Sequence, residues 1–140
     1  MPTYLIVAYQ TAGGQPLRDA ISEVSRRNRG VEFRLLVPAT RIQHLFTWSA
    51  GEADAVAKAK ADEVAQELRS VGVPLTDAVV GDPDPFTAVV DELAARPDVD
   101  GILVSTFPPG VSRWLRADLP SRLRKETGLP VIHVTADPET

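Results

Sequence analysis

The chain has 140 residues, 44% hydrophobic and 24% charged, which is the composition of one folded domain and not of a disordered or fibrous chain. Its formal net charge of −4 gives a field that repels nucleic acids and anionic membranes, so neither is expected as a partner. Cysteine is absent, which excludes disulfides, thiolate metal sites and cysteine nucleophiles.

The N-terminal segment predicts a buried strand followed by an amphipathic helix. Residues 3–9 (TYLIVAY) are apolar and rich in β-branched side chains, a pattern typical of a parallel strand covered on both faces. Pro16 suits the first turn of a helix that should end near residues 28–30, after the basic residues of its last turn. Because the sequence has no basic leader and no apolar run long enough to cross a bilayer, we expect a cytoplasmic protein.

A second strand and a long irregular connection are expected next. Residues 31–39 (VEFRLLVPA) alternate at first and then become wholly apolar, which predicts a strand whose start is partly exposed. Residues 40–49 follow no clean period, and their apolar side chains are expected to pack onto the body of the protein. His44 lies in this connection without a second ligand at metal-binding spacing, so no metal site is assigned to it.

The next stretch predicts a long helix, a short strand and another helix. Residues 49–52 (SAGE) match a capping box, and Gly72 should end the helix that follows. The apolar face of this helix is expected to carry Ala57, Ala61, Val64, Leu68 and Val71. Residues 74–81 contain the strand. Asp82 and Asp84 precede a proline-started helix, so they are interpreted as caps and not as metal ligands.

The C-terminal part completes an alternation of strands and helices. Residues 101–106 (GILVST) predict a central strand and residues 130–135 (PVIHVT) a final one. Between them Pro120 either starts a helix or kinks one begun at Arg113. Strands that alternate with helices predict an α/β fold, in which a parallel sheet has helices on both faces. No linker or repeat interrupts residues 1–140, so a single domain is expected.

The stretch from residue 100 to residue 134 (DGILVSTFPPGVSRWLRADLPSRLRKETGLPVIHV) resembles the C-terminal half of universal stress proteins. The matching features are an apolar strand before a small-residue turn, a basic segment before the last helix, and a proline before the final Val-rich strand. The order and length of the elements are similar along the whole chain. The resemblance implies a three-layer Rossmann-like sandwich of the adenine nucleotide alpha hydrolase-like group, with a five-stranded parallel sheet in the order 3-2-1-4-5. It also implies a homodimer that pairs through the last strand, at Val131, Ile132, His133 and Val134.

The sequence departs from the pattern of the ATP-binding members of this family. Those members carry an aspartate just after the first strand, where this chain has residues 9–11 (YQT). They also carry a G-x-x-G-x9-G-S/T signature after the fourth strand, of which at most Gly110 remains here. Pro108 and Pro109 remove two amide donors from that turn. Asp118 stands where the family's last helix begins with Gly-Ser/Thr, and a carboxylate there satisfies the helix amides and repels phosphate.

A ligand pocket is expected at the carboxyl edge of the sheet, where the first and fourth strands end. Arginines there can bind phosphate through paired hydrogen bonds, and serine or threonine hydroxyls can contact an anion. For Arg113 and Arg116, a surface role balanced against Asp118 and Glu126 is the alternative. No catalytic residue and no metal ligand is assigned. The candidate ligand-binding residues are Tyr9, Gln10, Thr11, Pro38, Ser105, Thr106, Gly110, Ser112, Arg113 and Arg116.

The favoured function is a non-catalytic, stress-related or regulatory domain that binds a small molecule through a degenerate nucleotide pocket. The loss of the signature glycines disfavours ATP or AMP as its cofactor. A functional adenine-nucleotide binder or hydrolase of the same fold is one alternative, although the sequence has no Walker A loop, pyrophosphate loop or nucleophile elbow. The other is a protein-interaction module that uses the aromatic connection around Phe46 and Trp48.

Overall fold

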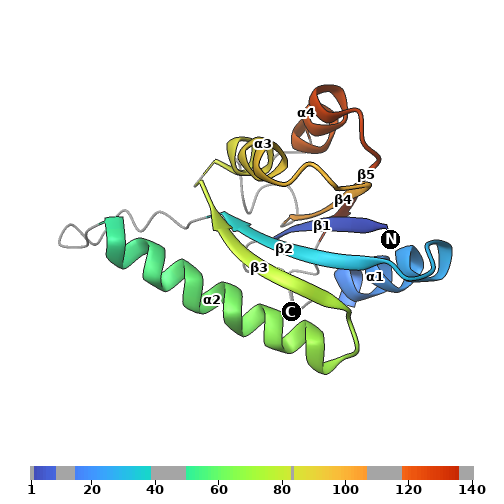
Figure 1. Ribbon diagram of the computed structural model, residues 1–140, viewed down its shortest axis with the longest axis horizontal. Coiled ribbons are helices and arrows are strands. Elements are labelled where there is room, and N and C mark those ends of the chain that lie inside the picture. The colour runs from blue at the N-terminus through green and yellow to red at the C-terminus, as the bar shows by residue number, and fades with distance from the viewer. Residues whose placement is uncertain (1, 9–14, 39–49, 83, 107–117, 136–140) are drawn as a thin grey trace.

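A computed structural model of the chain describes residues 2–8, 15–38, 50–82, 84–106 and 118–135, with the backbone alone described at residues 50–57, 60, 106 and 118. Within these ranges the expected alternation of strands and helices is confirmed (Figure 1). The strands are β1 (Thr3–Ala8), β2 (Glu32–Pro38), β3 (Leu75–Gly81), β4 (Gly101–Thr106) and β5 (Val131–Thr135), and the helices are α1 (Gln15–Arg27), α2 (Ala50–Ser70), α3 (Pro85–Ala95) and α4 (Asp118–Thr127).

The five strands form one parallel sheet in the order β3-β2-β1-β4-β5, which confirms the expected topology. β1 lies at the centre, where Ile6 is level with Leu35 on β2 and with Leu103 on β4. From β1 the chain adds β2 and β3 on one side, and it then returns to add β4 and β5 on the other. The direction of the connections therefore reverses between the neighbouring strands β1 and β4.

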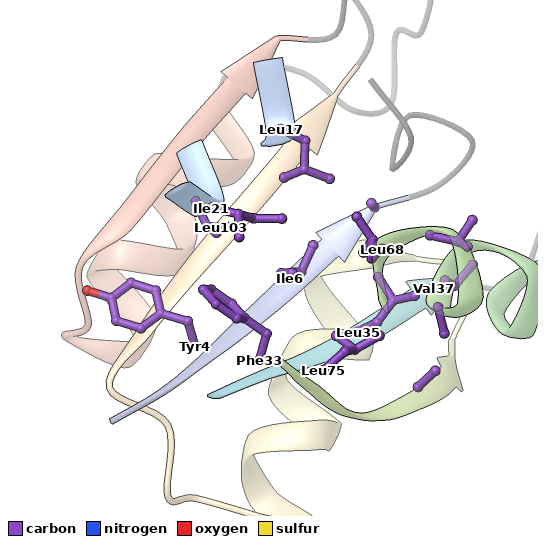
Figure 2. Close-up of a cluster of buried hydrophobic side chains, with 14 of the residues drawn as sticks. Tyr4, Ile6, Leu17, Ile21, Phe33, Leu35, Val37, Leu68, Leu75 and Leu103 are labelled. Atoms are coloured by element: carbon purple, nitrogen blue, oxygen red, sulfur yellow. The ribbon is translucent and has the colours of Figure 1, made fainter. Parts of the chain in front are cut away.

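The first apolar core lies between the sheet and the helices α1 and α2. Leu17 and Ile21 of α1 and Leu68 of α2 point onto the strands (Figure 2). At the amino end of the sheet the rings of Tyr4 and Phe33 pack with their centroids 6.5 Å apart. Full burial stabilises by about 1.5–3 kcal/mol for each large apolar side chain, so this core holds both helices against the sheet.

The second apolar core lies between the opposite face of the sheet and the helices α3 and α4. It includes Leu5, Val7, Leu36, Ala88, Val89, Ile102, Val104, Leu119, Leu123 and Val131. Because successive strand residues point to opposite faces and both faces are covered, β1 and β4 need apolar side chains at nearly every position. The guanidinium of Arg122 on α4 also lies 4.2 Å from the ring centroid of Phe86 on α3, a cation–π contact that joins the two helices.

Two glycines permit close packing at strand ends. A Cβ added to Gly101 would lie 2.4 Å from Cε2 of Tyr4, which is level with it on β1. A Cβ added to Gly81 would lie 2.8 Å from the Cβ of Ala88 on α3. Real Cβ atoms do not approach other heavy atoms this closely, so the Tyr4 ring and helix α3 can take these positions only against glycine.

The predicted helix ends at Asp84 and Gly72 are confirmed, whereas the capping box predicted at residues 49–52 begins outside the described residues and stays a prediction. Asp84 caps α3 and accepts a hydrogen bond from the backbone N–H of Thr87, as predicted. Gly72 has a φ of 91° and follows the end of α2, also as predicted. The prediction that Val71 lies on the buried face was wrong, because the helix ends before it and its side chain is 51% exposed. Pro120 lies in the first turn of α4, where its missing N–H costs no intrahelical bond.

Candidate functional site

The carboxyl edge of the sheet brings the ends of three neighbouring strands together. Ala8 on β1 is level with Ser105 on β4, and Pro38 is the last residue of β2 on the other side of β1. Neighbouring strands are about 4.8 Å apart, so the chain leaves β2, β1 and β4 from adjacent points. Open α/β sheets bind ligands where the connections of two such strands diverge. The edge at β1 and β4 is therefore the candidate site.

Three of the predicted ligand-binding residues belong to the described part of this edge. Pro38 is buried at the end of β2, and Ser105 is 1% exposed on β4, one residue before Thr106 ends the strand. The Ser105 hydroxyl therefore lies inside the protein and not at its surface. The remaining predicted residues lie outside the described ranges, and their role stays a prediction; they are Tyr9, Gln10, Thr11, Gly110, Ser112, Arg113 and Arg116. The aromatic connection that carries His44, Phe46 and Trp48 lies outside them as well.

Helices α3 and α4 both have an aspartate at their start. The Asp84 carboxylate accepts from the backbone N–H of Thr87 at 3.1 Å and from the Thr87 hydroxyl at 2.7 Å. Asp82 accepts in turn from the backbone N–H of Asp84 at 2.9 Å, so both act as caps, as predicted. α4 begins at Asp118. The Asp84 carboxylate adds negative charge where the positive end of the α3 dipole would otherwise attract an anion.

The histidine and acidic side chains of the described ranges form no metal cluster, because no group of three or more of them could hold a metal ion. None of the helices there is long and apolar enough to span a membrane. On β5, burial and then the positive charge of Arg124 lower the pKa of His133, so this imidazole is neutral near physiological pH.

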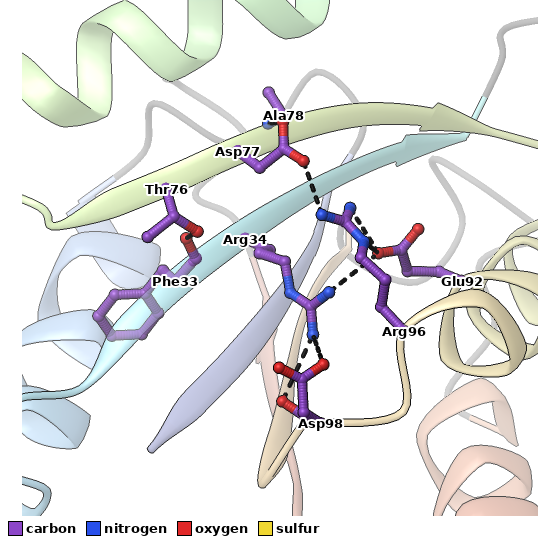
Figure 3. A network of polar contacts seen from close by, with 8 residues as sticks. All are labelled: Phe33, Arg34, Thr76, Asp77, Ala78, Glu92, Arg96 and Asp98. Atoms are coloured by element: carbon purple, nitrogen blue, oxygen red, sulfur yellow. Dashed lines mark hydrogen bonds and ion pairs between the residues drawn. The ribbon is translucent and has the colours of Figure 1, made fainter. Parts of the chain in front are cut away.

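A second polar cluster lies at the opposite, amino edge of the sheet. Arg34 on β2 is 5% exposed, and its guanidinium lies 3.4 Å from Glu92 of α3 and 3.3 Å from Asp98. Arg96, at the end of α3, lies 2.7 Å from Glu92 and 2.7 Å from Asp77 on β3. Figure 3 shows the two guanidiniums converging on the Glu92 carboxylate. We call these five residues the Arg34 network.

The Arg34 network joins secondary-structure elements and does not form a ligand site. Each of its charges has an opposite charge within ion-pair distance, and the pairs connect β2, β3, α3 and the segment before β4. The hydrogen bond from Arg96 is the main cause that lowers the pKa of Asp77, and the same bond raises the pKa of Arg96. The sequence predicted a partly exposed strand start here and missed the burial of Arg34. The available signal was an arginine between the apolar residues Phe33 and Leu35.

Solved structures with the same arrangement of strands and helices decide the fold. A universal stress protein from Archaeoglobus fulgidus matches with a TM-score of 0.60 at 14% identity, over 96% of this chain and 93% of that one. A universal stress protein family protein from Arabidopsis thaliana, solved with AMP bound, matches with a TM-score of 0.59 at 13% identity, over 99% of this chain and 94% of that one. The chain has the universal stress protein fold.

The universal stress protein fold is established here by shape and not by sequence identity. The hypothetical protein MJ0577, the subject of a structure-based assignment of biochemical function, matches with a TM-score of 0.57 at 20% identity, over 96% of each chain. No family model and no curated protein matches the sequence.

Proposed function

We propose that residues 1–140 form a single, non-catalytic domain with the universal stress protein fold, which binds a small molecule other than ATP in a stress-related or regulatory role. The pocket would lie where β1 and β4 end side by side. The AMP-bound neighbour from Arabidopsis thaliana supports the use of this fold for small-molecule binding. The observation that carries the proposal is the start of α4 at Asp118.

Helices α3 and α4, which cover the same face of the sheet, begin in a way that disfavours phosphate binding. A helix N-terminus binds phosphate through free amides and the positive end of its dipole. α4 begins at Asp118 and has Pro120 in its first turn, so a carboxylate adds negative charge and one amide hydrogen is missing. α3 begins after Asp84, whose carboxylate already accepts from the N–H of Thr87. A triphosphate would meet negative charge at both helix starts.

The residues at the end of β4 support the same conclusion. Pro108 and Pro109 follow this strand in the sequence and supply no amide hydrogens to a ligand. Ser105, a hydroxyl at this strand end, is 1% exposed, and a nucleophile must reach the substrate and a general base. These features favour a retained scaffold with an altered, non-catalytic pocket.

A thermal-shift series with ATP, ADP, AMP and cyclic AMP, each with and without Mg²⁺, tests the proposal. A ligand present at about 100 times its Kd stabilises the folded state by about 2.7 kcal/mol, which raises Tm by about 5 °C or more in a chain of this size. We expect no such rise with ATP. A concentration-dependent rise with magnesium-ATP would overturn the loss of ATP binding.

A functional adenine-nucleotide binder is the second candidate, and the AMP-bound neighbour favours it. It places the pocket at the same strand ends, so only the nucleotide series separates it from the first candidate. A rise in Tm with AMP and none with ATP would indicate that the site recognises the nucleoside and lacks room or charge for a triphosphate. A rise with both would establish this second candidate.

We also propose that two copies of the chain pair through β5. This strand lies at one edge of the described sheet, and Ile132 on it is 36% exposed. Unpaired edge strands are templates for another strand, and a two-fold axis beside β5 would extend the sheet across two copies. Ile132→Glu should shift the sedimentation coefficient toward the monomer, whereas Val71→Glu, at an exposed apolar residue far from β5, should not. A native chain that sediments as a monomer at every accessible concentration would contradict the pairing.

A further inference from the structure

An apolar groove of about 380 Å³ lies between the C-terminal halves of α3 and α4. One wall comes from α3 and the segment that leads into β4, and the other comes from the end of α4 and the segment that leads into β5. Its apolar lining includes Val90, Leu93, Pro97, Val99 and Leu129. Since β4 and β5 begin here, the groove lies at the edge of the sheet opposite the proposed nucleotide-type pocket.

The core beneath the groove gives it a fixed floor. Val99 is buried, and Leu129 packs against the same apolar core. The cation–π contact between Arg122 and Phe86 joins α3 and α4 closer to their N-termini than the groove. The volume falls in the range of small-molecule pockets, about 300–1,000 Å³. The groove is thus large enough for one small apolar molecule.

The charged side chain in the lining is Glu126, and it is exposed. None of the described basic side chains forms an ion pair with it. Lys125 precedes it, but successive residues of a helix point in different directions. The other polar lining group, the Thr127 hydroxyl, donates to the carbonyl of Leu123 at 2.6 Å and accepts from the N–H of Leu129 at 3.2 Å. Of the two polar groups in the lining, Glu126 is therefore the one without a partner among the described basic side chains.

Two helix ends add to the negative charge of Glu126. α3 ends at Ala95 and α4 at Thr127, so the carbonyl ends of both helices lie beside the groove. The C-terminal end of a helix carries a partial charge of about −0.5 and favours cations. Arg96, which follows α3, is already held by Asp77 and Glu92 in the Arg34 network. Arg122, one turn before Glu126, lies over Phe86, and Arg124 and Lys125 in the last turn of α4 offset part of the helix-end charge. None of these three residues lines the groove, whose own charged group is Glu126, so the lining favours a ligand with a positive group.

We propose that this groove binds an apolar primary ammonium ion, a molecule with a hydrocarbon or aromatic body and one –NH₃⁺ group. The body would cover Val90, Leu93 and Leu129, and the ammonium group would pair with Glu126 beside the two helix ends. A ligand with a carboxylate or phosphate in the same place is repelled by the same charges. This site is separate from the proposed function, since it lies at the other edge of the sheet and takes another class of ligand.

Methyl-detected NMR titrations with three matched probes test this site. 4-Phenylbutylamine, 4-phenylbutan-1-ol and 4-phenylbutanoate share the apolar body and differ in charge. We expect the amine to bind most tightly and the carboxylate most weakly, with shifts at the methyl groups of Val90, Leu93, Val99 and Leu129. Glu126→Gln should lower the affinity for the amine by about threefold, the size of an exposed ion pair, and leave the alcohol unchanged. Asp62→Asn, which removes the same charge from α2 on the opposite face, should change neither.

A variant that fills the groove separates binding there from binding elsewhere. Ala94 lines the groove from the exposed side of α3, so Ala94→Trp blocks the groove without entering the core and should abolish the shifts with every probe. Equal affinities for amine and alcohol would overturn the proposal, and so would amine binding that Ala94→Trp retains. Loss of self-association in Ala94→Trp would assign the groove to a second copy of the chain and would overturn it as well.

Discussion

Replacing Glu92 by leucine tests whether the Arg34 network holds buried charge in place. Glu92 contacts both guanidiniums, Arg34 at 3.4 Å and Arg96 at 2.7 Å. In Glu92→Leu, Arg96 keeps Asp77 at 2.7 Å. Arg34 keeps Asp98, whose side chain is 83% exposed. The substitution therefore leaves a guanidinium inside the protein with one solvent-exposed acidic partner.

The expected loss follows from how much of this charge remains compensated. Removing one partner of a buried ion pair costs about 3–5 kcal/mol. Because the side chain and carbonyl of Asp98 still accept from Arg34 at 3.3 and 3.4 Å, we expect about 3 kcal/mol in the free energy of unfolding. The double variant Arg34→Met/Glu92→Leu should lose less than Glu92→Leu alone, since it leaves no uncompensated buried charge. The control Asp62→Asn breaks an exposed pair with Lys58, which is worth about 0.2–1 kcal/mol.

Urea unfolding followed by far-UV circular dichroism measures these free energies, and an unchanged m value shows that the denatured state is comparable. The order of stability expected is native, then Asp62→Asn, then the double variant, then Glu92→Leu. A Glu92→Leu chain as stable as Asp62→Asn would refute the reasoning, because it would mean that the Arg34 guanidinium does not depend on Glu92. A double variant less stable than Glu92→Leu would refute it too.

Gly101→Ala should lower the free energy of unfolding by about 1–3 kcal/mol through overpacking, because the new Cβ would lie 2.4 Å from Tyr4; native stability in this variant would show that the ring moves freely. Gly30→Ala is the comparison, since nothing lies within 4 Å of its added Cβ and only the φ of 77° opposes it. Burial, and then Arg124, lower the pKa of His133 below the ordinary 6.5, so the unfolded chain takes up the proton first and stability falls as the pH drops below that value. His133→Gln should flatten this dependence in urea titrations at mildly acidic pH, and an unchanged slope would contradict the assignment.

Local patterns predicted the elements of this fold well because each element carries its own signal. β1 and β4 are apolar at nearly every position since helices cover both faces of the sheet. Asp84, which precedes a proline, begins α3 by capping its first turn. Gly72 ends α2 because it takes a positive φ. The order of the strands came from the family resemblance and not from periodicity. Neighbours such as Tyr4 and Gly101 are brought together by the whole fold and leave no local pattern.

The predictions that failed or stayed open depend on contacts between distant segments. Arg34 is buried because Glu92 and Asp98 lie against it, and neither is near it in sequence. Val71 fits the helical period of α2 but is exposed, because the helix ends one residue before it. The candidate site could be predicted only as a position. The parallel topology brings the ends of β1 and β4 together. The side chains that would face a ligand follow no helix or strand periodicity, so the sequence pattern does not identify them.

Isothermal titration calorimetry of the native chain with magnesium-ATP tests most directly whether ATP binding at the β1–β4 edge has been lost. The comparison is a variant that combines Pro108→Gly, Pro109→Gly and Asp118→Ser. We expect no saturable heat from the native chain at ligand concentrations of about 1 mM, where even a weak site with a Kd of that size would be half filled. The variant, which regains amide donors and loses the carboxylate at the start of α4, should bind measurably. Saturable binding of magnesium-ATP by the native chain would contradict the proposed function.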